Sequence, residues 1–302
     1  MTLRVLDPGL CTMLVDYGRP AFRSLGVPVG GAADRFSLAV GNALVGNAPD
    51  AAALEMTLSG PTLQADTPLA CVVFGAPFVL ESNRQRLITG RTFTLYPQEL
   101  LRIDGTPEGA RAYFCVRGGF RVQEILGSRS GLEPLRADAD LHYCPGTIAG
   151  RFIRPTFTWN SEPKLIRTLD GPQASWFEAC EFYDQTFAVT PASNRMGLRL
   201  RGRPLARPNR ELVSEPVCPG AVQVTRNGQC IVLGVDGQTI GGYPKIAHVI
   251  SADLDKLGQL RPEARIRFTR VTLADAEAAH WHKQAELREW LTRLQVAESL
   301  SP

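Results

Sequence analysis

Residues 221–235 read AVQVTRNGQCIVLGV, and residues 236–245 continue as DGQTIGGYPK. Two apolar segments flank Asn227-Gly228, and both residues of this pair tolerate the positive φ of a type I′ turn. We therefore predict a β-hairpin here. The following decapeptide gathers a carboxylate, an amide, a hydroxyl, a phenol and an ammonium around Gly241-Gly242, where the backbone can approach a ligand closely or turn with positive φ. The stretch thus predicts both a β fold and a ligand-binding loop.

Similar short strands recur along the chain. They are rich in β-branched and aromatic residues, and Gly, Pro, Asn or Asp bounds them. The pattern predicts a mainly β protein with few helices. The clearest strands are expected at residues 70–74, 93–96, 112–116, 222–225, 230–235, 246–250 and 265–271.

Two helices are expected. The first begins after Asp34, which suits an N-cap, and ends at Gly46-Asn47. The second covers about residues 273–297, and Thr272 and Asp275 before it have the spacing of a capping box. This helix carries an apolar stripe that we expect to dock on the protein's own surface, made of Leu287, Trp290, Leu291 and Leu294.

Composition excludes several classes of function. The net charge of +3 is small for 302 residues, and basic and acidic residues are interleaved, which argues against nucleic acid or a membrane surface as partner. The N-terminus does not resemble a signal peptide, and no apolar run approaches the ~18 residues of a membrane span. We expect a cytoplasmic protein.

Cysteine and histidine usage predicts no metal site. The seven cysteines are widely spaced and include no C-x-x-C pair, which favours free thiols over a disulfide framework. His280 and His282 lie two apart on the expected C-terminal helix, so they point in different directions.

Chain length and a polar, proline-punctuated stretch predict two domains. Residues 154–163 read RPTFTWNSEP, and a strand-like segment follows. We place the boundary near residue 160, giving a first domain of residues 1–160 and a second of residues 161–302.

Several motifs together resemble one known family. It is the carboxyltransferase-type family that includes the C subunit of bacterial 5-oxoprolinase, KipA, the so-called allophanate hydrolase subunit 2 and part of urea carboxylase. The resemblance covers nearly the whole chain and implies two cyclophilin-like β-barrel-type domains. It rests on Gly18-Arg19-Pro20, Leu44-Val45-Gly46-Asn47, Leu126-Gly127-Ser128-Arg129-Ser130, Ser193-Asn194-Arg195-Met196-Gly197, Ser214-Glu215-Pro216 and residues 236–245.

Two carboxylates are the candidate catalytic residues. Glu215 follows Ser214 at an expected strand end and could orient water or hold Mg²⁺, or it could be a rim carboxylate bonded to backbone. Asp236 opens the polar loop. Arg195 could clamp a ligand carboxylate or pair with Asp236.

Other residues are expected to bind substrate or nucleotide. Lys245 would add an ammonium at the pocket rim, and Tyr243 could stack on a planar ring. Asp34 could instead cap its helix and Asp16 pair with Arg19. The whole expected binding set is Asp16, Arg19, Asp34, Arg195, Gln223, Gln238, Thr239, Gly241, Gly242, Tyr243 and Lys245.

The resemblance implies one component of an ATP-dependent hydrolase that opens 5-oxoproline to glutamate. It implies ATP with Mg²⁺ as well as two partners, a KipI-like B subunit plus an A subunit. Alternatives are a KipA-like protein that sequesters a kinase inhibitor, and a component of biotin-dependent carboxyl transfer with biotin on another chain. The chain departs from the family pattern by losing polar side chains at Val15, Gly30, Gly131 and Gly237, and by carrying the amide of Asn194 where relatives have a carboxylate.

Overall fold

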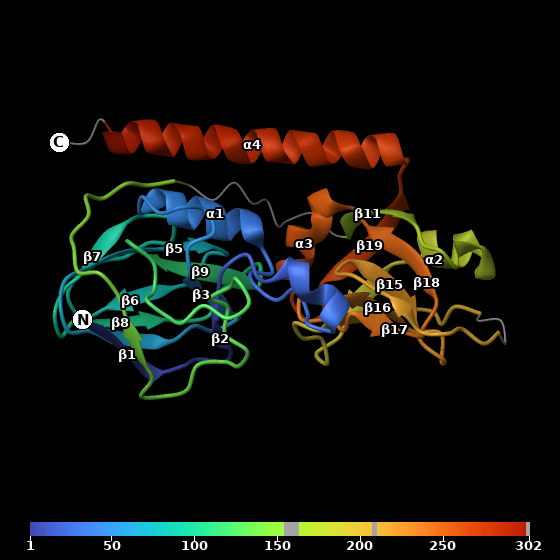
Figure 1. Cartoon of the computed structure of the whole chain (residues 1–302), viewed down its shortest axis with the longest axis horizontal. Coiled ribbons are helices and arrows are strands. Elements are labelled where there is room, and N and C mark those ends of the chain that lie inside the picture. Colours follow the sequence, from blue (N-terminus) through green and yellow to red (C-terminus); the bar gives the residue numbers. More distant parts are fainter. Residues whose placement is uncertain (154–162, 207–209, 300–302) are drawn as a thin grey trace. The chain divides into compact units, whose positions relative to one another are not determined.

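The computed structural model describes residues 1–153, 163–206 and 210–299 (Figure 1). The chain forms two compact units, neither of which is continuous in sequence. Unit 1 comprises Met1–Gly18, Asp34–Trp159 and Glu286–Pro302, and unit 2 comprises Arg19–Ala33 and Asn160–Ala285. The boundary expected near residue 160 falls outside the described residues and stays a prediction.

Unit 1 contains two five-stranded sheets. Their strand orders are β10-β1-β4-β8-β6 and β2-β3-β9-β5-β7, and all neighbouring strands are antiparallel. The bounds are β1 (Thr2–Asp7), β2 (Thr12–Val15), β3 (Ala53–Thr57), β4 (Thr62–Ala65), β5 (Leu69–Gly75), β6 (Leu80–Ser82), β7 (Phe93–Leu95), β8 (Leu100–Ile103), β9 (Arg111–Val116) and β10 (Asp140–His142).

The core of unit 1 draws side chains from both sheets. Leu3 and Leu101 come from the first sheet, and Leu54, Val73 and Phe114 from the second; all are inaccessible to solvent. In β1 the buried residues alternate with exposed ones, as expected when one face of a sheet packs on a core.

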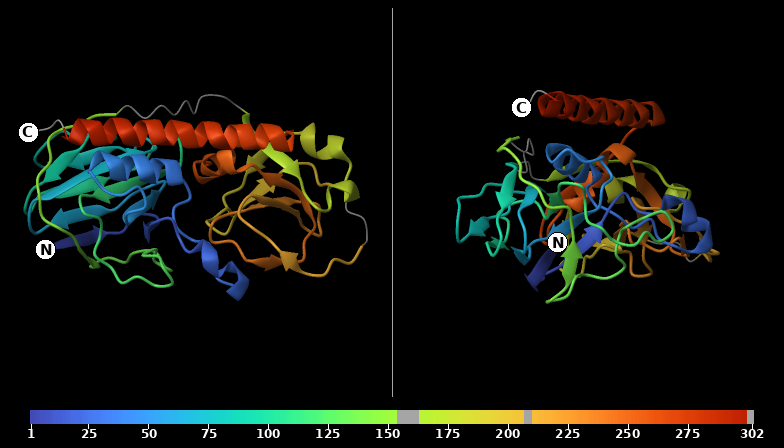
Figure 2. Two further views of the ribbon diagram at one scale, coloured as in Figure 1. Left: turned by 45° about the horizontal axis from the view of Figure 1, so that its top comes forward. Right: turned by 60° about the vertical axis from the view of Figure 1, so that its left-hand side comes forward.

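Helix α1 (Arg35–Leu44) covers the second sheet, where it packs on β5 and β9 (Figures 1 and 2). Asp34 is its N-cap, because the carboxylate accepts hydrogen bonds from the Ser37 backbone N at 3.0 Å and from Ser37 Oγ at 2.7 Å. The expected helix and its capping residue are confirmed.

Unit 2 is a closed barrel of seven strands in the order β11-β18-β15-β16-β13-β12-β19. β11 and β19 pair in parallel, and the other pairs are antiparallel. A separate ribbon joins β14 to β17. The bounds are β11 (Lys164–Asp170), β12 (Phe187–Val189), β13 (Gly197–Arg201), β14 (Glu215–Pro216), β15 (Ala221–Val224), β16 (Cys230–Leu233), β17 (Ile240–Gly241), β18 (Lys245–Val249) and β19 (Arg265–Arg270).

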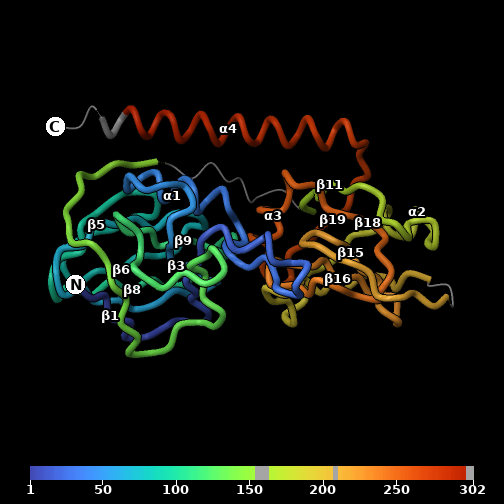
Figure 3. The backbone as a smooth tube through the Cα atoms, viewed as in Figure 1, coloured from blue at the N-terminus to red at the C-terminus, as the bar shows by residue number. Residues whose placement is uncertain are grey.

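The barrel of unit 2 encloses its own core. Phe182 stacks on Phe268 with ring centroids 4.7 Å apart, and Val222 and Val232 contribute from neighbouring strands. Unit 2 also contains short helices, of which Figure 3 labels α2 and α3. They are η1 (Pro20–Leu25), η2 (Ala174–Trp176), α2 (Ala179–Tyr183), η3 (Ser251–Asp253) and α3 (Leu254–Gly258).

The hairpin predicted around Asn227-Gly228 is confirmed, because β15 pairs with β16. The predicted type I′ turn is wrong. Only Gly228 has positive φ, at 77°, and its N–H donates to the Thr225 carbonyl oxygen. Thr225 N also donates to the Gln229 carbonyl oxygen, so a longer turn ends in a left-handed glycine, the other common way to close a hairpin.

The C-terminal helix α4 (Leu273–Ser299) is continuous over its full length (Figure 2). Thr272 and Asp275 exchange the hydrogen bonds of the expected cap. None of the helices in the described ranges combines the length and the apolar character needed to cross a membrane. The expected stripe is covered: Leu294 is buried, and Leu287, Trp290 and Leu291 are half-buried. The prediction of a mainly β fold with a C-terminal helix is therefore confirmed.

Candidate functional site

An ion pair joins the buried Lys245 at the start of β18 to Glu215 in β14. Lys245 Nζ lies 2.8 Å from Glu215 Oε2. The lysine side chain is only 1% exposed, whereas the carboxylate side chain is 35% exposed. The hydrogen bond from Lys245 lowers the pKa of Glu215, so this carboxylate is ionised at neutral pH. The expectation of a lysine at the pocket rim is wrong, because the barrel strands enclose its side chain.

Gln173 holds both members of this pair. Its Nε2 donates to Glu215 Oε1 at 3.1 Å, and its Oε1 accepts from the Lys245 backbone N at 3.0 Å. Its own backbone N donates to the Lys245 carbonyl oxygen. Gln173 was not among the expected site residues. Only its place in the sequence motif Gly171-Pro172-Gln173 could have indicated it.

Gln223 and Gln238 approach the same ribbon. A Cβ built on Gly241 would lie 2.5 Å from Gln238 Nε2 and 2.7 Å from Gln223 Nε2. Gly241 is a β17 residue, and neither it nor Gly242 has positive φ. The requirement for glycine at position 241 therefore comes from two side-chain amides that occupy the space over its Cα.

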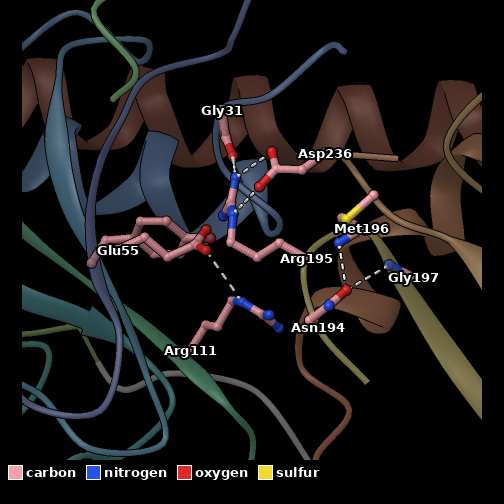
Figure 4. A network of polar contacts seen from close by, with 9 residues as sticks. Gly31, Glu55, Arg111, Asn194, Arg195, Met196, Gly197 and Asp236 are labelled. Atoms are coloured by element: carbon pink, nitrogen blue, oxygen red, sulfur yellow. Dashed lines mark hydrogen bonds and ion pairs between the residues drawn. The ribbon is translucent and has the colours of Figure 1, made fainter. Parts of the chain in front are cut away.

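Arg195 and Asp236 form a second polar group in unit 2 (Figure 4). Arg195 Nε lies 2.6 Å from Asp236 Oδ2, and its terminal nitrogen donates to Asp236 Oδ1 at 3.0 Å and to the Gly31 carbonyl oxygen at 2.6 Å. The expected alternative of pairing with Asp236 is thus observed. The bidentate contact engages the carboxylate that we had expected to be catalytic.

Arg19 lies near this second group. A Cβ on Gly30 would stand 3.7 Å from an Arg19 guanidinium nitrogen and 4.0 Å from Asp236 Oδ1. Gly30 N also donates to the Val235 carbonyl oxygen. Unit 2 therefore brings together Arg19, the Gly30-Gly31 loop, Arg195 and Asp236.

The two expected aspartates of unit 1 have structural roles. Asp16 accepts hydrogen bonds from Ser128 Oγ and Ser130 Oγ at 2.6 Å each, and from the backbone N of Gly18 at 2.7 Å and of Arg129 at 2.5 Å. Burial tends to raise the pKa of Asp16, but these hydrogen bonds outweigh it and the pKa is lowered. Asp16 thereby fixes the loop that carries both serines.

Asp34, besides capping α1, belongs to a buried network in unit 1. Its backbone N donates to Tyr113 Oη, and Tyr113 Oη donates to Glu55 Oε2, both at 2.8 Å. Arg111 Nε lies 3.2 Å from Glu55 Oε1 (Figure 4). Burial and the Glu55 charge raise the pKa of Tyr113 well above its ordinary value, so this phenol is a hydrogen-bond donor to Glu55.

The remaining expected residues flank the β14–β17 ribbon. Thr239 is buried, and its carbonyl oxygen accepts from Val217 N. Tyr243 is 37% exposed. A Cβ on Gly242 would lie 3.2 Å from Ser214 Oγ. Within the described ranges no cluster of three or more His, Cys, Asp or Glu side chains could hold a metal ion.

Cys218 and His248 form a weaker polar pair, with Sγ and Nδ1 3.8 Å apart. Burial raises the pKa of the Cys218 thiol, and burial together with the Lys245 charge lowers the pKa of His248. Both side chains are therefore neutral near pH 7. In this state Cys218 is a thiol, which is a weaker nucleophile than a thiolate.

The chain is one of the carboxyltransferase-domain proteins. A family model described as "Carboxyltransferase domain, subdomain A and B" matches residues 25–270, and the chain belongs to this family. It is 32% identical to the 5-oxoprolinase C subunit of Escherichia coli, covering 97% of this chain and 98% of that protein. It is 31% identical to the 5-oxoprolinase C subunit of Haemophilus influenzae, covering 90% of this chain and 92% of that protein.

A solved structure shares the fold. The crystal structure of the K. lactis urea amidolyase superposes with a TM-score of 0.86 at 26% identity over 96% of this chain. The chain spans only 20% of that longer protein. The likeness therefore concerns one part of the amidolyase.

Proposed function

We propose that this chain is one component of an ATP-dependent hydrolase that opens the lactam of 5-oxoproline to give glutamate. The observation that carries the proposal is the match along 98% of the Escherichia coli 5-oxoprolinase C subunit, whose name states this substrate. The match also spans the segment that holds Glu215, Gln223 and Lys245.

The chemistry of the ribbon suits an amide substrate. An unstrained lactam is a poor electrophile, and preorganised donors aimed at its oxygen stabilise the charge that develops when water attacks. Lys245 supplies a buried ammonium for this purpose. Glu215 is a weak base because its pKa is lowered, so we assign it to binding and orientation instead of proton abstraction.

The residues expected to hold ATP and Mg²⁺ do not fit that role. A triphosphate needs uncompensated positive charge, yet Lys245 is paired with Glu215 and Arg195 is paired with Asp236. The same pairs neutralise both carboxylates that could have bound Mg²⁺, which lowers their attraction for a divalent cation. We therefore propose that the nucleotide binds to a partner protein, and that this chain binds the lactam.

The proposal requires partners. We propose a KipI-like B subunit plus an A subunit, with this chain inactive alone. Glutamate release from 5-oxoproline, measured with and without ATP, should appear only when the purified chain is mixed with both partners. ATP-dependent conversion by the chain alone would refute the requirement. Lack of conversion by the reconstituted complex would refute the proposed activity.

The family description favours carboxyl transfer as a second candidate. In that case a carboxylated biotin on another chain would donate its carboxyl group to an acceptor held by this chain. Transfer of ¹⁴C from a carboxybiotinylated carrier to a stable product, without glutamate release, would support this second candidate over the first.

A further inference from the structure

Four residues of unit 2 contact one another in a ring, which we call the circuit: Lys245, Glu215, Gly241 and Gln223. Lys245 pairs in register with Gln223 across β18 and β15, and Glu215 pairs in register with Gly241 across β14 and β17. Directly opposed residues of antiparallel strands project to the same face, with Cβ atoms about 4.5–5.5 Å apart. The ion pair closes the circuit on one side, and the Gln223 amide over Gly241 closes it on the other.

One donor in this circuit lacks an acceptor, and a second is only partly used. Gln223 is 2% exposed, and among the described residues no atom accepts a hydrogen bond from its Nε2. Lys245 Nζ is equally buried, and within the part of the chain that the structure describes its one partner is Glu215, which leaves two of its protons without an acceptor there. Leaving buried donors unsatisfied is costly, and in native proteins this usually indicates a missing partner.

Glu215 offers the complementary acceptor. An ionised carboxylate has about four lone-pair sites, and Lys245 and Gln173 together use two of them. The 35% exposure of its side chain leaves it accessible to a ligand. The ion pair is neutral overall, so the group offers no excess charge to a simple anion.

We infer that this group recognises the O=C–N–H edge of a cis amide, as in a lactam or a ureide. The carbonyl oxygen accepts from Lys245 Nζ and Gln223 Nε2, and the ligand N–H donates to Glu215. Gly241, which has no side chain, leaves the room over its Cα that the Gln223 and Gln238 amides occupy beside this edge. The choice of 5-oxoproline as the ligand rests on the proposed function. Recognition of an O=C–N–H edge is inferred separately, from the unused donors of Lys245 and Gln223 and the unused lone pairs of Glu215.

A series of five-membered rings tests the edge with the full-length protein. Ligand-observed NMR would compare 2-pyrrolidinone with N-methyl-2-pyrrolidinone, which lacks the N–H, and with γ-butyrolactone, which replaces it by oxygen. We expect 2-pyrrolidinone and 5-oxoproline to bind, and the two analogues to bind at least tenfold more weakly, because neither analogue can donate a hydrogen bond to Glu215. Equal binding of N-methyl-2-pyrrolidinone, or equally strong binding of acetate, would overturn the inference.

Two variants test the protein side. Gly241→Ala should push the two flexible amides away with little change in melting temperature, and Gln223→Glu replaces a donor by an acceptor. Each should weaken 2-pyrrolidinone binding at least tenfold. Gln229→Glu, a half-buried amide on the same hairpin, is the matched control and should bind normally.

The outcomes separate this inference from the proposed function. A reconstituted complex whose kcat/KM for 5-oxoproline is unchanged by Gly241→Ala and Gln223→Glu refutes the inference and leaves the function standing. N–H-dependent lactam binding by a complex that releases no glutamate refutes the function alone. Failure of 2-pyrrolidinone and 5-oxoproline to bind to either the chain or its complex also refutes the inference.

Discussion

Lys245 is almost fully enclosed, yet the carboxylate that neutralises it, Glu215, is one-third exposed at 2.8 Å. Removing either partner should therefore have unequal effects. Glu215→Leu leaves a buried ammonium without its counter-charge and should lower the free energy of unfolding by about 3–5 kcal/mol. Lys245→Met leaves a carboxylate that water can reach, so the free energy of unfolding should fall by about 1 kcal/mol or less. Urea unfolding would measure both.

The double variant provides the control for this asymmetry. With both charges replaced by apolar groups, most of the stability lost in Glu215→Leu should return. Equal losses in the two single variants would show that the burial of Lys245 does not determine the energetics of the pair.

Asp16 should make unit 1 sensitive to acid. Its folded-state pKa lies below the ordinary 3.8, so its contribution to stability is present above pH 3.8 and is lost as pH falls through the folded-state value. Asp16→Asn should cost about 2–3 kcal/mol at pH 7, and the loss should shrink as the pH falls below 3.8 towards the folded-state pKa. Chemical unfolding at several pH values would test this, and a pH-independent loss would contradict it.

Arg195 should resist conservative replacement. Lysine cannot reproduce the bidentate contact with Asp236 while also donating to the Gly31 carbonyl oxygen. Arg195→Lys should cost roughly 2–3 kcal/mol, and faster amide exchange should appear at Gly30, whose N–H bonds to Val235 next to Asp236. Exchange at the β15–β16 hairpin amides serves as the internal reference and should not change.

The corrected turn at residues 225–229 gives a simple stability test. Gly228→Ala forces a side chain into positive φ and places a Cβ 2.6 Å from the Leu205 carbonyl oxygen, so we expect a loss of roughly 1–3 kcal/mol. Asn227→Ala should cost less than about 1 kcal/mol, since Asn227 has no positive φ to maintain. Similar losses at both positions would instead favour the type I′ turn.

Local sequence patterns predicted the elements of this protein well. Alternating and β-branched segments indicated strands such as β9 and β15, and Asp34 and Thr272 indicated the starts of the two long helices. These features depend on residues within a few positions of each other. The hairpin around Asn227-Gly228 was predicted correctly for the same reason, although its turn type was not.

The sequence also indicated which segment holds the polar ribbon, because Glu215, Gln223, Gln238 and Lys245 fall within 31 positions. It did not indicate how they pair. Gln173 contacts Glu215 and Lys245 from 42 and 72 positions away, and no local pattern encodes a contact at that separation.

The sequence by itself determined the β-rich fold class, the helix caps and the position of the polar loop, because periodicity and capping are local properties of the chain. Only the tertiary structure decided that Lys245 is buried, that Asp236 is engaged by Arg195 and that Gly241 faces two amides. These depend on closure of the seven-stranded barrel and on the ribbon that pairs β14 with β17. Both bring distant residues together, and the resulting burial sets which charges are paired and which buried donors lack an acceptor among the described residues.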